Sequence, residues 1–308
     1  MKSILHPKLQ ILENQFSRSI LTPINDPVLS ERQLQLFLKR DDLLHPIISG
    51  NKWRKLKYIL NNALENGANT LISMGGAYSN HLHALAFVGK SLGIKTQGYI
   101  RGEQPACWNP TLQDLQKWGM QLHFVSRSEY RQLRQFKHHD SLPDLKPGEY
   151  WLPEGGSTHL ALQGVAEIIP EIETEFDVLM VACGTGTTLA GLISSVSDHA
   201  QVLGVAALKG GVFLVKDVTN LLAEQPTRTK WQILLDYHFG GFGKLTHVLT
   251  AFMQQFQIQH AVPLEPIYTA KTLYAFYDLV QQDYFKAGTR IILLHTGGLQ
   301  GWRQSPGL

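Results

Sequence analysis

Lys52 is the first residue whose type and position suit covalent chemistry. It directly follows a glycine and an asparagine in the stretch 49–58, SGNKWRKLKY, and falls in the first turn of a helix predicted over residues 52–66. The field at a helix N-terminus disfavours a cation, so it lowers the pKa of the lysine and favours the unprotonated amine that a Schiff base requires. Lys55 and Lys57 lie deeper in the helix, where solvation or ion pairing explains them. The plain alternative for the whole run is a solvated basic helix face, and we expect it to hold for Lys57, less for Lys55 and not for Lys52.

A second turn, rich in glycine and threonine, suits a phosphate group. It reads CGTGTTL over residues 183–189 and lies between the apolar run 178–182 and a predicted helix. Backbone N–H groups converge on an anion at such a turn, and threonine hydroxyls add donors. No Gly-Lys-Ser/Thr follows, and Leu189 stands where a dinucleotide-binding fingerprint has its third glycine, so neither nucleotide motif is present. We interpret the turn as the phosphate site of a bound cofactor, and the alternative is a plain tight turn.

A third turn, GGAYSNH over residues 75–81, carries polar side chains into the start of another predicted helix. Ser79 is a good N-cap, which explains it structurally whether or not it has a further role. Asn80 and His81 follow in the first helical turn, where they can bind a carboxylate or a ring hydroxyl. His83 makes a pair with His81, but two histidines without a third suitably spaced ligand predict no metal site.

The elements that must position these turns alternate between strands and helices. Helical periodicity predicts helices over residues 52–66 and 79–92 and from the glycine–threonine turn to about residue 195. Short apolar runs predict strands at residues 36–38, 70–74, 95–100, 122–125, 178–182, 202–206 and 290–294. This alternation predicts parallel sheets covered by helices, with ligands gathered where strands end. The polar stretch 127–148 is predicted to be a surface helix and loop.

Composition narrows the class of protein. The chain has 308 residues, of which 44% are hydrophobic and 17% charged, and this is typical of a globular protein with a substantial core. A net charge of +3 is too small to indicate a nucleic-acid or membrane partner. Cys107 and Cys183 are too few for a disulfide framework, which fits a reducing compartment. Neither a signal peptide nor a membrane-spanning apolar stretch is evident, so we expect a cytoplasmic protein.

Two further segments complete a pattern that resembles a known family. They are EPIYTAK over residues 265–271 and HTGG over residues 295–298. Taken in order across roughly residues 39–301, the motifs resemble the pyridoxal-phosphate (PLP)-dependent group of 1-aminocyclopropane-1-carboxylate (ACC) deaminase and D-cysteine desulfhydrase. The likeness is most specific over residues 39–58 and in the turn 75–81.

The resemblance implies the α/β fold of the tryptophan synthase β subunit, called fold type II. That fold has two open, twisted, mostly parallel sheets flanked by helices, with the cofactor between a large and a small domain. The large domain would comprise residues 1–53 and 161–308, and the small domain residues 54–160. Family members are commonly dimers, so the resemblance also implies a homodimer, with a small amino acid as substrate.

The resemblance also implies roles for individual residues. Lys52 would carry PLP covalently and later move the α-proton of the substrate. Ser79 and His81 would bind the substrate carboxylate, Ser79 also lying near the reacting carbon, and Asn80 would bind the ring hydroxyl close to the substrate. Tyr268 would lie near the ring and substrate. The other implied cofactor contacts are Thr296 at the pyridine nitrogen and Lys55, Cys183, Gly184, Thr185, Gly186, Thr187 and Thr188 around the phosphate.

Substitutions within the motifs favour one activity of the family. ACC deaminases have glutamate at the position of Thr269 and leucine at that of Thr296. A carboxylate keeps the ring nitrogen protonated and strengthens the electron sink, whereas a hydroxyl does not. Ring opening needs that sink more than loss of a β-substituent does, so we expect D-cysteine desulfhydrase-like elimination to pyruvate, ammonia and sulfide.

One residue leaves alternatives open. Phe242, expected to contact the substrate, stands where the family usually has a second tyrosine, and Tyr237 can replace that tyrosine only if the loop is shifted. ACC deamination to 2-oxobutanoate and ammonia, or PLP binding without turnover, therefore remain as alternatives. A nucleotide-binding α/β protein would need a phosphate fingerprint that is absent.

Overall fold

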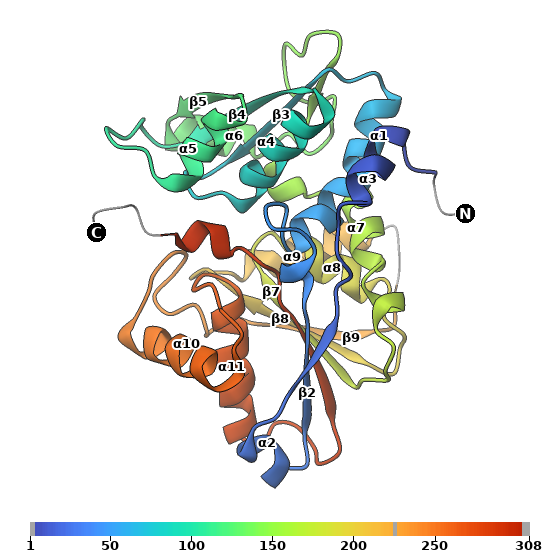
Figure 1. Ribbon diagram of the computed structural model, residues 1–308, viewed down its shortest axis with the longest axis vertical. Helices are drawn as coiled ribbons and strands as arrows, with labels where there is room; N and C mark the ends of the chain where they lie inside the picture. Colours follow the sequence, from blue (N-terminus) through green and yellow to red (C-terminus); the bar gives the residue numbers. More distant parts are fainter. Residues whose placement is uncertain (1–3, 224–226, 304–308) are drawn as a thin grey trace.

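The computed structural model describes residues 4–223 and 227–303, which form two separate β-sheets surrounded by helices (Figure 1). The larger sheet has the strand order β1-β2-β10-β7-β8-β9, and the smaller sheet has the order β5-β4-β3-β6. Among the described strands, β1 pairs with β2 in antiparallel fashion, and the other pairings are parallel. The larger sheet consists of β1 (Leu21–Ile24), β2 (Gln35–Lys39), β7 (Val178–Cys183), β8 (Gln201–Ala206), β9 (Lys230–Leu234) and β10 (Arg290–Leu294). The smaller sheet consists of β3 (Thr70–Gly75), β4 (Lys95–Arg101), β5 (Met120–Val125) and β6 (Glu149–Trp151).

Helices pack against both sheets because the central strands are apolar on both faces. Every residue of β3 and of β7 is buried, as expected for parallel strands covered on two sides. In Figure 1 the smaller sheet lies in the upper part with α4, α5 and α6, and the larger sheet lies below. The α-helices are α1 (Pro7–Glu13), α2 (Pro27–Glu31), α3 (Asn51–Glu65), α4 (Asn80–Leu92), α5 (Pro110–Lys117), α6 (Arg127–Leu133), α7 (His159–Ala166), α8 (Thr187–Ile193), α9 (Phe213–Leu222), α10 (His247–His260) and α11 (Thr269–Gln281). Short 3₁₀ turns are η1 (Asp41–Leu43), η2 (Glu154–Gly156), η3 (Ile169–Glu171) and η4 (Leu299–Trp302).

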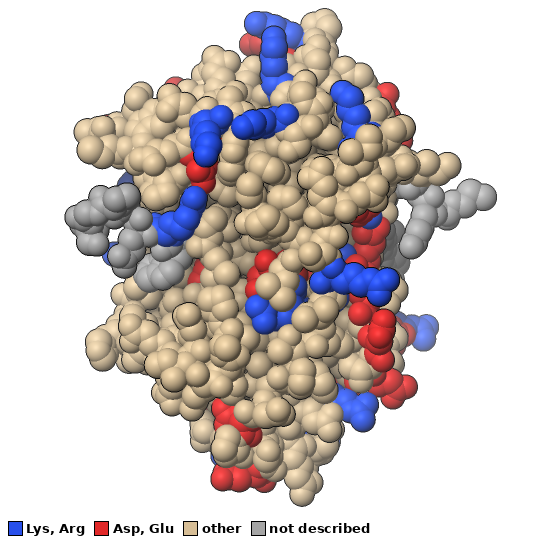
Figure 2. Space-filling model, viewed as in Figure 1, with Lys and Arg blue, Asp and Glu red and all other residues tan. Residues whose placement is uncertain are grey.

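The predicted alternation of strands and helices is confirmed. Each predicted strand is present, and the predicted helices correspond to α3, α4 and α8. The polar stretch 127–148 holds α6 followed by a loop, as expected. On the face shown in Figure 2, charged side chains of both signs are scattered over a mostly uncharged surface. No helix within residues 4–223 and 227–303 is long and apolar enough to cross a membrane. The domain boundaries stay a prediction.

Helix α3, which carries Lys52, is buried along most of its length, and one interpretation of the basic run is therefore wrong. Lys57 was expected to lie on a solvated face, yet it is only 7% exposed. Its Nζ lies 2.6 Å from Glu13 Oε1 and 2.9 Å from Glu167 Oε2, so ion pairing explains it instead. The helix is buried because its apolar side packs into one cluster with residues of α1, β3 and α4. A cation in such a place needs carboxylate partners.

Arg54 fixes the first turns of α3 to the 3₁₀ turns η1 and η3. Its guanidinium contacts both carboxylate oxygens of Asp41, at 3.1 and 3.2 Å, and lies 2.7 Å from Glu171 Oε2. Lys39, at the end of β2, pairs with the same Glu171 at 2.8 Å. The backbone of the same helix turn lies against α7, since a Cβ on Gly164 would lie 1.9 Å from the Arg54 carbonyl oxygen. The position of Lys52 is thus set by a buried ion cluster and a close helix contact.

Candidate active site

The turns singled out in the sequence meet where strands of the two sheets end. Gly50, the N-cap of α3, has φ 67°, and a Cβ there would lie 1.8 Å from the carbonyl oxygen of Thr296. Glycine is therefore required for these two segments to touch. A Cβ on Gly298, farther along the second segment, would lie 2.8 Å from Asn80 Nδ2. The start of α3, the start of α4 and the segment after β10 consequently form one site.

Lys52 lies in this site with a lowered amine pKa. Its Nζ donates a hydrogen bond to Asn51 Oδ1 at 2.7 Å, and Asn51 Nδ2 donates to Thr188 Oγ1 at 2.9 Å. Burial lowers the pKa of Lys52 to about 8, against the opposing charge of Glu265. The direction agrees with the sequence argument, but burial rather than the helix dipole is the largest cause. Such an amine is unprotonated near neutral pH far more often than an ordinary lysine, as addition to an aldehyde requires.

Two other lysines also have lowered pKa values, so the pKa alone does not select the reactive one. Burial lowers the pKa of Lys271 to about 8, and its Nζ donates to the carbonyl oxygens of Ala207, His238 and Gly241, each at 3.0 Å. With these acceptors Lys271 holds loops together. Burial, followed by the charge of Lys52, lowers the pKa of Lys55 to about 7. Lys55 lies on α3, and its side chain reaches the glycine–threonine turn.

Hydroxyl groups and the Lys55 amine lie close together at the glycine–threonine turn. Lys55 Nζ donates to Thr185 Oγ1 at 3.3 Å, the hydroxyls of Thr185 and Thr187 are 3.0 Å apart, and Thr187 donates to Ser157 at 3.0 Å. The buried Thr158 Oγ1 has no hydrogen-bond partner. A dianionic phosphate would supply the missing acceptor and the counter-charge that Lys55 lacks. These residues therefore fit the phosphate of PLP.

The other residues of the turn contribute mainly through the backbone. Gly186 has φ 76° at the N-cap of α8, where a residue with a side chain would be strained. The Cys183 side chain packs in an apolar cluster, and burial raises the pKa of its thiol to about 12. The Thr188 hydroxyl is used to hold Asn51. A cavity of about 350 Å³, lined in part by Gly184 and Thr185, opens beside the turn.

Ser79 and Asn80 lie at the start of α4. Ser79 Oγ accepts a hydrogen bond from Leu82 N at 3.2 Å, which confirms the predicted N-cap. Asn80 Oδ1 accepts from Gln300 Nε2 at 3.0 Å, which leaves its Nδ2 as a donor. The carboxamide is thus oriented by η4, and its Nδ2 suits the ring hydroxyl of PLP.

His81 is buried and neutral. Burial and the charges of Lys55 and Lys52 lower the pKa of its ring to about 3. Ser73 Oγ donates to the Leu152 carbonyl oxygen at 2.8 Å, so it accepts from His81 Nε2 at 2.9 Å, and the proton of the ring is on Nε2. His81 Nδ1 is a buried acceptor without a partner. Any part of His81 in binding a carboxylate must come from its backbone N–H, since the ring offers no positive charge.

Two hydroxyls face each other where the pyridine nitrogen is expected. Thr269 Oγ1 and Thr296 Oγ1 are 3.5 Å apart. The nearby carboxylate of Glu265 already accepts from the backbone N–H groups of Ile267, Tyr268 and Thr269 at 2.6–2.8 Å. Burial raises the pKa of Glu265 despite these hydrogen bonds.

Tyr268 and Phe242 lie beside each other at the site. Their ring centroids are 5.9 Å apart in an edge-to-face arrangement, and Phe242 is 51% exposed. A Cβ on Gly184 would lie 3.0 Å from Tyr268 Cε1, so the phosphate turn approaches the tyrosine ring closely. Burial, with the charge of Glu265, raises the pKa of Tyr268, which stays protonated. Tyr237 donates to Asp278 Oδ2 at 2.7 Å, so its hydroxyl is held on α11 and does not stand in for a tyrosine at 242.

The comparisons with known proteins agree with this geometry. A family model described as pyridoxal-phosphate dependent enzyme matches residues 21–297. The chain belongs to this family. A Pyrococcus horikoshii protein provisionally named as an ACC deaminase is 29% identical, over 96% of each chain. An Arabidopsis thaliana protein named as a bifunctional mitochondrial D-cysteine desulfhydrase/ACC deaminase is 28% identical, over 87% of this chain and 73% of that protein.

Solved structures place the chain in fold type II. A crystal structure of an ACC deaminase homologue superposes with a TM-score of 0.72 at 28% identity, over 96% of both chains. The predicted fold class and PLP dependence are therefore confirmed, and the chain is a PLP-dependent enzyme of the ACC deaminase and D-cysteine desulfhydrase family. Within the described residues there is no group of three or more His, Cys, Asp or Glu side chains suited to a metal ion. The individual residue roles stay predictions.

The sequence did not predict the roles of several residues at the site. Glu265 caps three backbone N–H groups, and its only signal was an acidic residue just before the Pro-x-Tyr segment. Gln300 orients Asn80 from a distant part of the chain. Ser73 orients His81 from the preceding strand β3, and no local pattern predicts either contact. Lys271 was noted in a motif, but its structural role appears only with its carbonyl partners.

Proposed function

We propose that the protein is a PLP-dependent lyase that removes the β-substituent of a small amino acid. D-Cysteine is the proposed substrate, with pyruvate, ammonia and sulfide as products. Family membership and the activities named for its relatives support a small amino acid as the substrate class. When bound, PLP supplies an electron sink for the electron pair left at the substrate's α-carbon.

The chain's own residues have distinct parts in this proposal. Lys52 Nζ holds the cofactor and, as an amine of lowered pKa, takes the proton from the α-carbon. Ser79 and the backbone N–H groups that open α4 bind the substrate carboxylate, because a helix N-terminus favours an anion. Asn80 Nδ2 donates to the ring hydroxyl. Tyr268, kept protonated by burial, lies on the substrate side as a hydrogen-bond donor.

The single observation that carries β-elimination over ring opening is the hydroxyl pair. Thr269 and Thr296 offer neutral groups where the pyridine nitrogen is expected, and Glu265 is already engaged by backbone N–H groups. A neutral partner leaves the ring nitrogen less protonated and the electron sink weaker. Expulsion of a thiol tolerates a weaker sink than cleavage of a cyclopropane carbon–carbon bond does.

A product assay tests this function directly. Purified holoenzyme is incubated separately with D-cysteine, L-cysteine, D-serine and ACC, and pyruvate, sulfide and 2-oxobutanoate are measured. We expect pyruvate and sulfide from D-cysteine at the highest rate. Faster formation of 2-oxobutanoate from ACC would make the deaminase the function, and silence with every substrate would leave a PLP-binding protein without this turnover.

We also propose a homodimer whose protomers each have a large domain of residues 1–53 and 161–308 and a small domain of residues 54–160. Light scattering of the purified protein tests the dimer, since a monomer mass would exclude it. Expression of residues 54–160 as a separate fragment tests the boundaries, because a fragment that shows no cooperative unfolding transition would exclude an independent small domain.

A further inference from the structure

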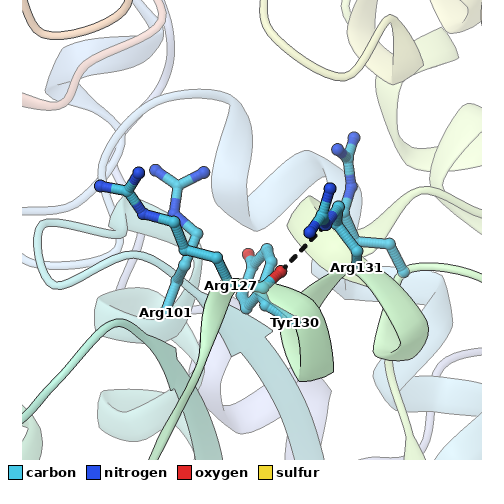
Figure 3. Close-up of a pocket in the computed structure, with 5 residues that line it drawn as sticks. Arg101, Arg127, Tyr130 and Arg131 are labelled. Carbon is cyan, nitrogen blue, oxygen red and sulfur yellow. Dashed lines mark hydrogen bonds between the residues drawn. The ribbon is translucent and has the colours of Figure 1, made fainter.

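A hollow lined by arginines lies on the outer part of the smaller sheet. Its volume is about 610 Å³, and its lining residues are Arg101, Arg127, Tyr130, Arg131 and Arg134. We call it the arginine pocket. Arg101 ends β4, and the other arginines come from α6 and the residue that caps it. Figure 3 shows Arg101 and Arg127 side by side on one rim, Tyr130 between, and Arg131 on the other side.

The positive charge of this pocket is largely uncompensated. Arg134 pairs with Glu154 at 2.8 Å. In the part of the chain that the structure describes, no carboxylate lies within ion-pair distance of Arg101, Arg127 or Arg131.

The remaining contacts of the pocket do not neutralise it either. Arg101 lies 5.5 Å from the Tyr130 ring centroid, and Arg131 Nε donates to the backbone oxygen of Arg127 at 3.3 Å. The neighbouring carboxylate of Glu129 accepts from Ser126 N at 2.7 Å and so caps α6.

Such an arrangement suits a ligand with several negative charges. Guanidinium groups bind phosphate and carboxylate through paired, planar hydrogen bonds, and like charges held together without a counter-ion repel one another. The volume lies within the range of small-molecule sites. We propose that the arginine pocket binds a small polyanion carrying at least two phosphate or carboxylate groups, at a site separate from that of PLP.

The pocket is connected to the active site through Glu154. The Tyr130 hydroxyl donates to Glu154 Oε1 at 2.6 Å, and Glu154 begins η2. The next residue, Gly155, is so close to the phosphate turn that a Cβ on it would lie 3.0 Å from Thr185 Cγ2. A polyanion that draws Arg134 away from Glu154 therefore disturbs a turn packed against the cofactor's phosphate site. Binding of the polyanion and binding of PLP are thus coupled.

Calorimetric titration of the PLP-loaded protein with pyrophosphate, and separately with citrate, tests the site at near-physiological ionic strength. The double variant Arg127→Gln/Arg131→Gln leaves the Arg134–Glu154 pair intact. Its matched control, Arg18→Gln/Lys286→Gln, removes the same charge from exposed positions outside the pocket.

We expect the wild type and the control to bind pyrophosphate and the pocket variant to bind it at least roughly tenfold more weakly. Equal binding by all three proteins, or no binding of either polyanion by the wild type, would overturn the proposal. Citrate binding with the same dependence on the arginines identifies carboxylates as ligands too, and pyrophosphate binding alone identifies a phosphorylated ligand.

The coupling is tested by the affinity of the apoprotein for PLP with and without pyrophosphate. We expect the affinity to change in the wild type and the control and to stay constant in the pocket variant. If pyrophosphate simply competed with PLP at the cofactor's own phosphate site, it would weaken PLP binding equally in all three proteins. That result would refute the coupling between the two sites but not the binding of a polyanion in the arginine pocket.

Discussion

Replacing Arg54 by methionine tests how Lys52 is positioned. The guanidinium lies between Asp41, which is fully buried, and Glu171, whose side chain is 37% exposed. Methionine keeps much of the side-chain volume and removes the charge. Breaking a buried ion pair costs about 3–5 kcal/mol, because the remaining charge is left without a partner. Most of this cost arises at Asp41, because Glu171 keeps Lys39.

Urea denaturation followed by both fluorescence and circular dichroism measures the loss, with coincident transitions as the test of two-state unfolding. The matched control is Arg32→Met, whose partner Asp283 is 79% exposed and whose ion pair is worth only about 0–1 kcal/mol. We expect Arg54→Met to lose several times more stability than the control, and to bind PLP more weakly because α3 is less well fixed. Equal losses in the two variants would refute the reasoning.

The pH dependence of this deficit also has a predicted sign. Burial works to raise the pKa of Glu171, but the hydrogen bond and charge of Arg54, and then those of Lys39, leave it below the ordinary value of 4.5. A carboxyl group whose pKa is lowered by folding contributes stability above its unfolded pKa, and this contribution is lost as the pH falls. The difference between wild type and Arg54→Met should therefore narrow in acid. A deficit that widens below pH 4.5 would contradict this assignment.

Two further predictions concern the lysines and the rim of the site. The pKa values of Lys52 and Lys55 in the folded protein are about 8 and about 7, below the ordinary 10.5. Between these values the unfolded chain binds more protons than the folded chain, so the stability of the apoprotein should rise from near pH 7 toward pH 10.5. Thermal melts at a series of pH values should show this rise, weakened in Lys55→Met and in the PLP-loaded protein. Phe242 is 51% exposed, so Phe242→Tyr should change stability by less than about 0.5 kcal/mol and raise ACC turnover relative to D-cysteine turnover by restoring a hydroxyl. An unchanged ratio of the two rates would remove Phe242 from the determinants of specificity.

The sequence predicted those parts of the fold that depend on local pattern. Apolar runs and glycine turns located the strands, and the turn chemistry at Ser79 located the start of α4. Burial of α3 was not predictable in this way, because Lys57 and Arg54 meet Glu13, Glu167, Asp41 and Glu171 from elsewhere in the chain. A basic run looks the same whether solvent or distant carboxylates neutralise it.

The same limit applies to the site. The glycine and asparagine that precede Lys52 predicted it as a site residue, and the residue types in the turns around it predicted those turns. The lowered pKa of the His81 ring depends on its burial and on the charges of Lys55 and Lys52, which no local sequence pattern shows. The tautomer of the ring depends on its hydrogen bond with Ser73. The contacts of Lys271 likewise arise from loops that the fold brings together. Glu265 differs, because its backbone partners Ile267, Tyr268 and Thr269 follow it directly in the chain.

The most direct test of the central claim is to identify the lysine that carries the cofactor. Borohydride reduction of the holoenzyme fixes PLP to its lysine, and mass spectrometry of the peptides locates the added pyridoxyl group. Lys52, Lys55 and Lys271 all have lowered pKa values, so the measurement discriminates among real candidates. We predict the label on Lys52 and the loss of the visible absorption band in Lys52→Ala. A label on Lys55 or Lys271, or a protein that takes up no PLP, would contradict the account.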